Sequence, residues 1–284
     1  MITCNLMGGL GNQLFQIFAT ISYAIKSKQS FKFVKADTLG GNNGVILRYT
    51  YWNTFLSRFG PFLIDVLPSV HVLRENGFRY NELPIQTNIN LNDTDNNIML
   101  YGYFQSYKYF EDNYAIICRI IGLDQKIAEL RERFPLDFEH MVSMHFRLGD
   151  YKKIQHIHPV ATYDYYKNAL RHIKNNTNNY ALEILYFCEE EDLREVLETI
   201  DKLSIQFPRY SFTRQGKELD DWEQLLLMSC CHHNIIANSS FSWWAAYFNS
   251  WNDKIVCYPS TWFGPAAKHD TSDLCPATFT KIMV

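Results

Sequence analysis

The second half of the chain constrains the fold most strongly, because strand-like and helix-like segments alternate from Met141 to Tyr258 with short connections. Apolar residues at every second position indicate strands, and apolar residues at helical spacing indicate helices. Repeated units of this kind predict an α/β fold with a doubly wound parallel sheet. The expected strands cover 141–146, 182–188, 210–213, 234–237 and 254–258, and the expected helices lie around 163–173, 193–200, 221–231 and 241–249.

The first half begins in the same way and then becomes irregular. Its expected elements are a strand over 2–7, a helix over 12–27, a strand over 31–34 and a later helix over 124–133. The expected apolar face of the first helix consists of Leu14, Phe18, Ile21 and Ile25. Runs rich in glycine and asparagine between Thr38 and Asn97, such as GGNNG and NINLNDTDNN, predict surface loops.

The length of 284 residues fits two domains. A break at Pro135 follows the helix expected over 124–133, and we place the domain boundary near residue 138. The sequence therefore predicts an N-terminal domain over 1–138 and a C-terminal domain over 139–284.

Charge and cysteine content argue against several classes of protein. The net charge is −3, with 27 basic and 30 acidic residues and no run of Lys or Arg, so we expect no nucleic acid partner. The seven cysteines are scattered and lie mostly in apolar segments, which predicts reduced thiols in a reducing compartment. We find neither a secretory signal nor a run of about 18 apolar residues, so we expect a cytoplasmic protein without a membrane span. The oligomeric state stays open.

The stretch GGLGNQ, from Gly8 to Gln13, lies between the first strand and the first helix. A dinucleotide fingerprint needs a glycine where Leu14 stands, and a phosphate-binding loop of the GxxxxGK[ST] type needs a Lys that is absent. The three glycines still allow a sharp turn and a close approach of the backbone to a ligand, with Asn12 at the mouth of the sheet. A purely structural turn is the alternative.

The stretch HFRLGDY, from His145 to Tyr151, lies at the carboxyl end of an expected strand, where open α/β sheets bind ligands. Side chains alternate along a strand, so His145 and Arg147 project to the same side and can converge on one anion. A planar guanidinium suits a pair of diphosphate oxygens. An exposed Arg followed by a Gly-Asp turn is the alternative.

Two further strand ends carry polar residues. In FCEEEDL, Glu189 and Glu190 suit the two N–H donors of a guanine, although acidic residues also favour a helix N-terminus without any ligand. Asn238, Ser239 and Ser240 precede another helix, where one of them suffices as a cap. The remaining groups of that helix N-terminus predict a second anion site.

We predict no metal site. In CCHH, from Cys230 to His233, neighbouring side chains on a helix diverge by about 100° and cannot converge on one ion. The pair His156 and His158 lacks evident partners. Two anion-binding strand ends without a metal motif predict a diphosphate site, and hence an enzyme that uses a nucleotide sugar.

Four motifs together resemble the α-1,2-fucosyltransferase family, in the family's order and over nearly the whole chain. They are GGLGNQLFQ, GYFQSYKYF over 102–110, HFRLGD, and LLLMSCCHHNIIANSSFSWWAAYFN over 225–249. The resemblance implies a GT-B architecture, in which two Rossmann-like domains face a central cleft. It also implies inverting transfer of L-fucose from GDP-β-L-fucose to the 2-hydroxyl of a terminal β-galactose on a glycan, without a metal or other cofactor. The lack of a membrane anchor is unlike the family's Golgi members and fits a soluble bacterial or viral enzyme.

The resemblance also implies roles for individual residues. The catalytic residues would be Arg147, Asp150 and Asn12. The donor GDP-fucose would be bound by His145, Arg147, Glu189, Glu190, Asn238, Ser239, Ser240 and Phe241. The acceptor side of the cleft would consist of Gly8, Gly9, Gly11, Asn12 and Gln13. The general base stays open between Asp150 and a phosphate oxygen.

The chain departs from the family at Leu148, where a second Arg is usual. Loss of a charge-assisted hydrogen bond costs about 1.5–3 kcal/mol unless another cation compensates. The candidates for compensation are Lys152, Lys153, Arg214 and Lys217. This departure keeps open the alternative of a binding protein with weak or no catalysis. A fucosyltransferase of α-1,6 or protein O-linked type is a second alternative.

Overall fold

The computed structural model describes residues 1–41, 46–85, 97–177, 181–215 and 218–283. The chain divides into two compact units, which are considered separately below. Unit 1 contains Met1–Gln125 and His269–Pro276, and unit 2 contains Lys126–Lys268 and Ala277–Val284. The boundary lies inside helix α3 (Leu123–Arg133), and the domain limits 1–138 and 139–284 stay a prediction.

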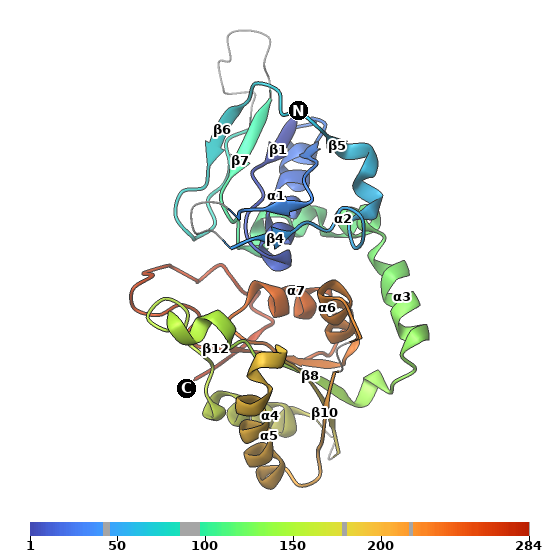
Figure 1. Cartoon of the computed structure of the whole chain (residues 1–284), viewed down its shortest axis with the longest axis vertical. Coiled ribbons are helices and arrows are strands. Elements are labelled where there is room, and N and C mark those ends of the chain that lie inside the picture. Colours follow the sequence, from blue (N-terminus) through green and yellow to red (C-terminus); the bar gives the residue numbers. More distant parts are fainter. Residues whose placement is uncertain (42–45, 86–96, 178–180, 216–217, 284) are drawn as a thin grey trace. The chain divides into compact units, whose positions relative to one another are not determined.

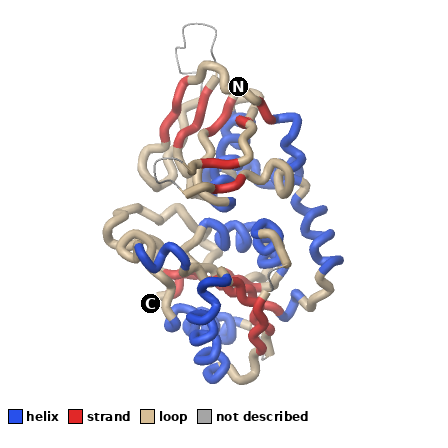
Figure 2. Tube along the Cα trace, in the orientation of Figure 1, coloured by secondary structure: helices blue, strands red, loops and turns tan. Residues whose placement is uncertain are grey.

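Unit 2 is built on a six-stranded parallel sheet with the strand order β10-β9-β8-β11-β12-β13 (Figures 1 and 2). Its strands are β8 (Met141–His145), β9 (Glu183–Phe187), β10 (Ser211–Arg214), β11 (His233–Ile235), β12 (Val256–Pro259) and β13 (Thr280–Ile282). The predicted parallel α/β sheet is confirmed, and the expected strands are correct to within one or two residues at each end. Only β13, an edge strand, was not expected from the sequence.

Four helices cover the two faces of this sheet. They are α4 (Tyr163–Asn176), α5 (Leu193–Gln206), α6 (Asp221–Cys230) and α7 (Ser240–Phe248). Helices α4 and α5 lie on one face, and α6 and α7 lie on the other (Figure 1). The buried Tyr165 of α4 ties its helix to the sheet, because its hydroxyl donates to the carbonyls of Ile236 and Cys257 at 2.5 and 2.9 Å. Helix α6 begins at a capping box of Asp220 and Glu223, whose two hydrogen bonds are both present.

Unit 1 contains a three-stranded parallel sheet of order β1-β7-β6, a parallel pair β2 and β5, and an antiparallel pair β3 and β4. These strands are β1 (Ile2–Cys4), β2 (Phe33–Val34), β3 (Thr38–Leu39), β4 (Arg48–Tyr49), β5 (Leu63–Ile64), β6 (His71–Arg74) and β7 (Ile98–Tyr101). Its helices are α1 (Leu10–Lys26) and α2 (Tyr114–Ile121). Residues 42–45 and 86–96, where most of the two predicted loop runs lie, fall outside the described residues.

Helix α1 differs from its prediction in two respects. It begins at Leu10, directly after the glycine pair, because Gly9 serves as the N-cap. It is also buried nearly all round rather than on one face, and Ile25 of the predicted apolar face is 36% exposed. Gln16, one of its buried polar residues, accepts a hydrogen bond from Met7 N and donates one to Gly102 O.

The described residues also contain short 3₁₀ helices. They are η1 (Ser57–Phe62), η3 (Tyr107–Tyr109) and η4 (Glu111–Asn113) in unit 1, and η5 (Phe138–His140), η6 (Gly149–Lys153) and η7 (Glu190–Asp192) in unit 2. All seven cysteines are free thiols. Among the described helices, none combines the length and the apolar character that crossing a membrane requires.

Candidate functional site

The polar residues singled out in the second half of the sequence meet at one edge of the unit 2 sheet. Arg147 follows β8, Glu189 follows β9, Arg214 ends β10 and Asn238 follows β11. All neighbouring strands of this sheet are parallel, so their carboxyl ends share an edge. This is the edge at which open α/β sheets bind ligands.

Arg147 is the central cation of this edge. Its guanidinium donates to Asp150 Oδ1 at 2.5 Å and to Glu189 Oε1. Burial acts to lower the pKa of Arg147, but the charges of Glu189 and Asp150 outweigh this effect and the pKa is raised. A guanidinium has five N–H donors, so an anion can bind those that remain or displace one carboxylate. The arrangement holds a permanent positive charge at the sheet edge.

An aromatic side chain with no predicted role, Tyr151, flanks Arg147. The guanidinium lies 5.0 Å from the centre of the Tyr151 ring, and Tyr151 stacks on His158 at 4.7 Å. His158 in turn contacts Phe263 at 5.4 Å. The Tyr151 hydroxyl lies 3.4 Å from the carbonyl of Asn238, which joins the loops after β8 and β11. The only sequence signal was the place of Tyr151 at the end of HFRLGDY.

Glu189 and Glu190 each face an arginine. Glu189 pairs with Arg147, and Glu190 accepts a hydrogen bond from Arg214 at 2.6 Å. This hydrogen bond is the main cause of the raised pKa of Arg214. Recognition of guanine by either carboxylate stays a prediction, and a guanine would have to compete with these ion pairs.

The four cations considered as replacements for a second Arg beside Arg147 have different surroundings. Lys152 pairs with Asp192 and Glu195, and Arg214 ends a strand that is separated from β8 by β9. Lys153 is exposed, and Lys217 lies outside the described residues. Leu148 itself is 8% exposed and belongs to the apolar core of unit 2.

Asp192 is a supporting residue that sequence reasoning missed. It is 2% exposed, and its carboxylate accepts hydrogen bonds from Gly149 N at 2.7 Å and Lys152 Nζ at 2.9 Å. Gly149 has a φ of +38°, and a Cβ there would lie 2.6 Å from Glu189 Oε2. Asp192 therefore anchors η6, the turn that carries Asp150 beside Arg147. Its signal in the sequence was an aspartate that follows three glutamates in FCEEEDL, at a helix start.

We expect Asp192→Asn to lower kcat/KM for the donor by about 5-fold to 100-fold, since a buried group loses a charge-assisted partner worth roughly 1–3 kcal/mol. The same substitution should lower the melting temperature. Steady-state kinetics and thermal unfolding measure the two effects. Glu195→Gln is the matched control, because it removes only the exposed partner of Lys152 and should change kcat/KM less than twofold. Wild-type kinetics in Asp192→Asn would contradict this role.

The loop before α7 is anchored by two of its three polar residues. Ser239 is the N-cap, and its Oγ accepts from Phe241 N at 3.3 Å. Asn238 is 2% exposed, and its Nδ2 donates to the carbonyls of Pro159 and Trp262 at 2.8 and 3.1 Å. The predicted anion site at this helix N-terminus stays a prediction.

His145 is 8% exposed, and its ring contacts Phe241 at 5.5 Å. Burial, with a smaller contribution from the charge of Arg147, lowers the pKa of His145 to about 3. Its Nδ1 has no hydrogen-bond partner among the residues that the structure describes. His145 therefore meets any ligand near neutral pH as an uncharged imidazole, and Arg147 supplies the charge.

The lowered pKa of His145 predicts a pH-dependent stability. The ordinary pKa is 6.5 and the folded value is about 3, so between these values the unfolded chain binds more protons. The free energy of unfolding should fall as the pH falls through this window, by up to about 1.4 kcal/mol per pH unit from this group. His145→Asn should remove that part of the slope in urea unfolding between pH 4.5 and 7. If the free energy of unfolding depends on pH in the same way in the wild type and the variant, His145 is not buried as described.

The glycine-rich turn of unit 1 holds Asn12 in a defined place. Gly8 has a φ of +77°, and a Cβ there would lie 2.4 Å from Asn12 Nδ2. Gln105 Nε2 donates to Asn12 Oδ1 at 2.8 Å. Gln13 is fully buried, and its amide holds the carbonyls of Gly8 and Tyr49. Asn12 is thus fixed at the first turn of α1, and Gln13 supports the turn from inside.

No group of three His, Cys, Asp or Glu side chains within the described ranges is arranged to hold a metal ion. The segment CCHH does not lie on one helix, as we had assumed, because α6 ends at Cys230 and β11 begins at His233. His232 bonds to the Glu139 carbonyl and to Asp253 at 2.9 and 2.8 Å.

Comparison with known proteins identifies the family to which the chain belongs. The family model for glycosyl transferase family 11 matches residues 76–272. The chain is similar to an α-1,2-colitosyltransferase of Escherichia coli, with 26% identity over 99% of both chains. It is also similar to the O-antigen biosynthesis glycosyltransferase WbnK of Escherichia coli, with 27% identity over 59% of this chain and 56% of the relative.

Proposed function

Because the chain belongs to glycosyl transferase family 11, the α-1,2-fucosyltransferase family, we propose that it transfers L-fucose from GDP-β-L-fucose to the 2-hydroxyl of a terminal β-galactose. The observation that carries the proposal is Arg147, a cation held between Asp150 and Glu189 at the carboxyl edge of a parallel sheet. A departing nucleoside diphosphate needs a charge of this kind.

The proposed reaction is a single displacement at C1 of the donor sugar. The acceptor oxygen forms a bond to C1 as the bond from C1 to the diphosphate oxygen breaks, and GDP leaves with the electron pair. Arg147 stabilises the charge that develops on GDP, and no metal ion is required in this proposal. The acceptor proton passes to Asp150 or to a phosphate oxygen. Attack from the face opposite GDP converts a β-linked donor into an α-linked product.

Two substrates are assigned to two units in this proposal. GDP is bound in unit 2 around Arg147, and the galactose of the acceptor glycan is recognised in unit 1 around Asn12, as in a GT-B enzyme. Asn12 suits this role because the turn from Gly8 to Gly11 and the amide of Gln105 hold its side chain in one place.

A specific observation favours a second donor. The relative that matches 99% of the chain is named for colitose, which is the 3-deoxy counterpart of L-fucose. Both sugars attach to GDP through the same carbon, so the role of Arg147 is the same for either. The two donors differ only in a hydroxyl group at C3, and a site that hydrogen-bonds this hydroxyl would reject the donor that lacks it.

The test is an assay of GDP release with GDP-fucose or GDP-colitose, each with and without methyl β-galactoside and EDTA. We expect release that depends on the galactoside and is unchanged by EDTA. Loss of release in EDTA would contradict metal independence. Calorimetric binding of GDP without turnover of either donor would favour the non-catalytic alternative.

A further inference from the structure

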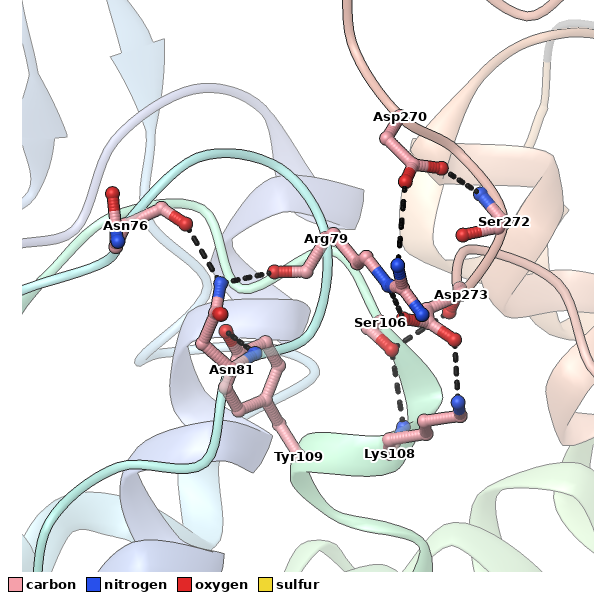
Figure 3. A network of polar contacts seen from close by, with 9 residues as sticks. All are labelled: Asn76, Arg79, Asn81, Ser106, Lys108, Tyr109, Asp270, Ser272 and Asp273. Carbon is pink, nitrogen blue, oxygen red and sulfur yellow. Dashed lines mark hydrogen bonds and ion pairs between the residues drawn. The ribbon is translucent and has the colours of Figure 1, made fainter.

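The loop after β7 connects two parts of unit 1 that are far apart in the sequence. Gln105 Nε2 donates to Asn12 Oδ1 at 2.8 Å. The next residue, Ser106, donates from its hydroxyl to the carbonyl of Asp273 at 2.7 Å, and Lys108 pairs with the Asp273 carboxylate (Figure 3). The motif GYFQSYKYF, which the proposed chemistry does not use, is therefore the link between the glycine-rich turn and the segment His269–Pro276.

The Asn12 side chain is held from two sides. Its Nδ2 lies so close to Gly8 that a Cβ there would approach it to 2.4 Å. Its Oδ1 faces the amide nitrogen of Gln105. If the Asn12 amide were reversed, two NH₂ groups would face each other. Gln105 thus fixes the orientation of the Asn12 amide, with Oδ1 toward Gln105 and Nδ2 toward Gly8.

Gln105 is itself well anchored. It is 8% exposed, and the two residues before it are fixed by Glu75, whose Oε2 accepts from Tyr103 N and Phe104 N at 2.8 and 2.9 Å. Phe104 has a φ of +52°, a strained value for a bulky residue that the surrounding contacts impose. The side chain of Gln105 therefore has little freedom to move away from Asn12.

The segment from the C-terminal part of the chain completes the anchor, as Figure 3 shows. Asp273 is 7% exposed, and besides Lys108 it accepts from Arg79 Nε at 3.1 Å. Desolvation acts to raise the pKa of Asp273, but the hydrogen bonds from Lys108 and Arg79 outweigh it and the pKa is lowered. A charged carboxylate with two cationic partners thus clamps the residues that follow Gln105.

We propose that Gln105 is a positioning residue, which holds the Asn12 side chain in one orientation for contact with the acceptor sugar. This inference rests on the proposed function, in which Asn12 contacts the acceptor sugar.

The kinetic test is a double-mutant cycle. Gln105→Leu should lower kcat about 10-fold and leave GDP affinity unchanged, because it removes only the hydrogen bond to Asn12. The double variant Asn12→Ala with Gln105→Leu should be no slower than Asn12→Ala alone. Gln16→Leu is the control, since Gln16 holds the same loop through Gly102 O without touching the Asn12 side chain. The effect of Gln16→Leu on kcat should add to that of Asn12→Ala. If the effect of Gln105→Leu on kcat also adds to that of Asn12→Ala, the proposal is overturned.

A second measurement does not depend on activity. The side-chain amide signal of Asn12, assigned by its absence in Asn12→Asp, should shift in the nitrogen-15 NMR spectrum of Gln105→Leu and stay in place in Gln16→Leu. An unmoved signal in Gln105→Leu would overturn the positioning role. If the wild type transfers no sugar but the signal shifts as expected, the proposed function fails while the orientation of Asn12 by Gln105 stands.

Discussion

Arg147→Ala should lower kcat/KM for the GDP-linked donor by about 10²-fold to 10³-fold or more, because it removes the charge that we propose stabilises the departing diphosphate. In the structure Arg147 is flanked by Asp150 and Glu189, so its removal also leaves two carboxylates without their cation at the site of an incoming anion. Their repulsion should weaken GDP binding as well as catalysis. Steady-state kinetics and calorimetric titration with GDP measure the two losses.

Two controls separate charge from geometry. Arg147→Lys keeps the charge but loses the planar pair of donors, so it should recover only part of the activity. Arg171→Ala removes an exposed arginine from α4 and should leave the kinetics unchanged. Full activity in Arg147→Ala with a normal melting temperature would show that the diphosphate binds elsewhere.

Leu148→Arg should destabilise the protein by about 3–5 kcal/mol, although it restores the residue that the family usually has. Leu148 is 8% exposed and belongs to the same apolar cluster as Phe146, Tyr166 and Tyr186. A guanidinium there would lose its hydration among apolar side chains. Urea unfolding followed by fluorescence gives the free energy directly.

The matched control at this position is Leu148→Met, which nearly conserves volume and should cost less than about 1.5 kcal/mol. If Leu148→Arg is as stable as the wild type and more active, position 148 faces the ligand and the chain lacks a second arginine that it could use. We expect instead that the core of unit 2 has adapted to Leu148, so that a single substitution cannot restore the arginine.

Most of the parallel sheet of unit 2 could be predicted, because a helix with regular spacing separates each strand from β8 to β12 from the next. Unit 1 was harder, since its first strand β1 pairs with the central strand β7, which lies beyond two irregular regions of the chain. Strand β6 is mostly exposed, so it shows no clear apolar alternation. The contribution of His269–Pro276 to unit 1 has no local signal in the sequence.

The candidate site shows the same division. Arg147, Glu189 and Asn238 follow apolar strands, and position alone placed them at one sheet edge. Asp192 and Gln105 could not be predicted, because their roles depend on partners that the fold brings close from distant parts of the chain. For α1, the sequence predicts a single buried face, and the structure buries Gln13 and Gln16 as well. Their burial could not be predicted, because their partners are backbone groups of other loops.

The linkage and anomeric configuration of the product test the central claim most directly. The wild-type protein should be incubated with GDP-β-L-fucose or GDP-β-L-colitose and methyl β-galactoside, and the purified product examined by NMR. We predict an α-linked 6-deoxy sugar whose anomeric proton correlates with C2 of galactose. A β-linked product, a linkage to another hydroxyl, or no product from either donor would contradict the account.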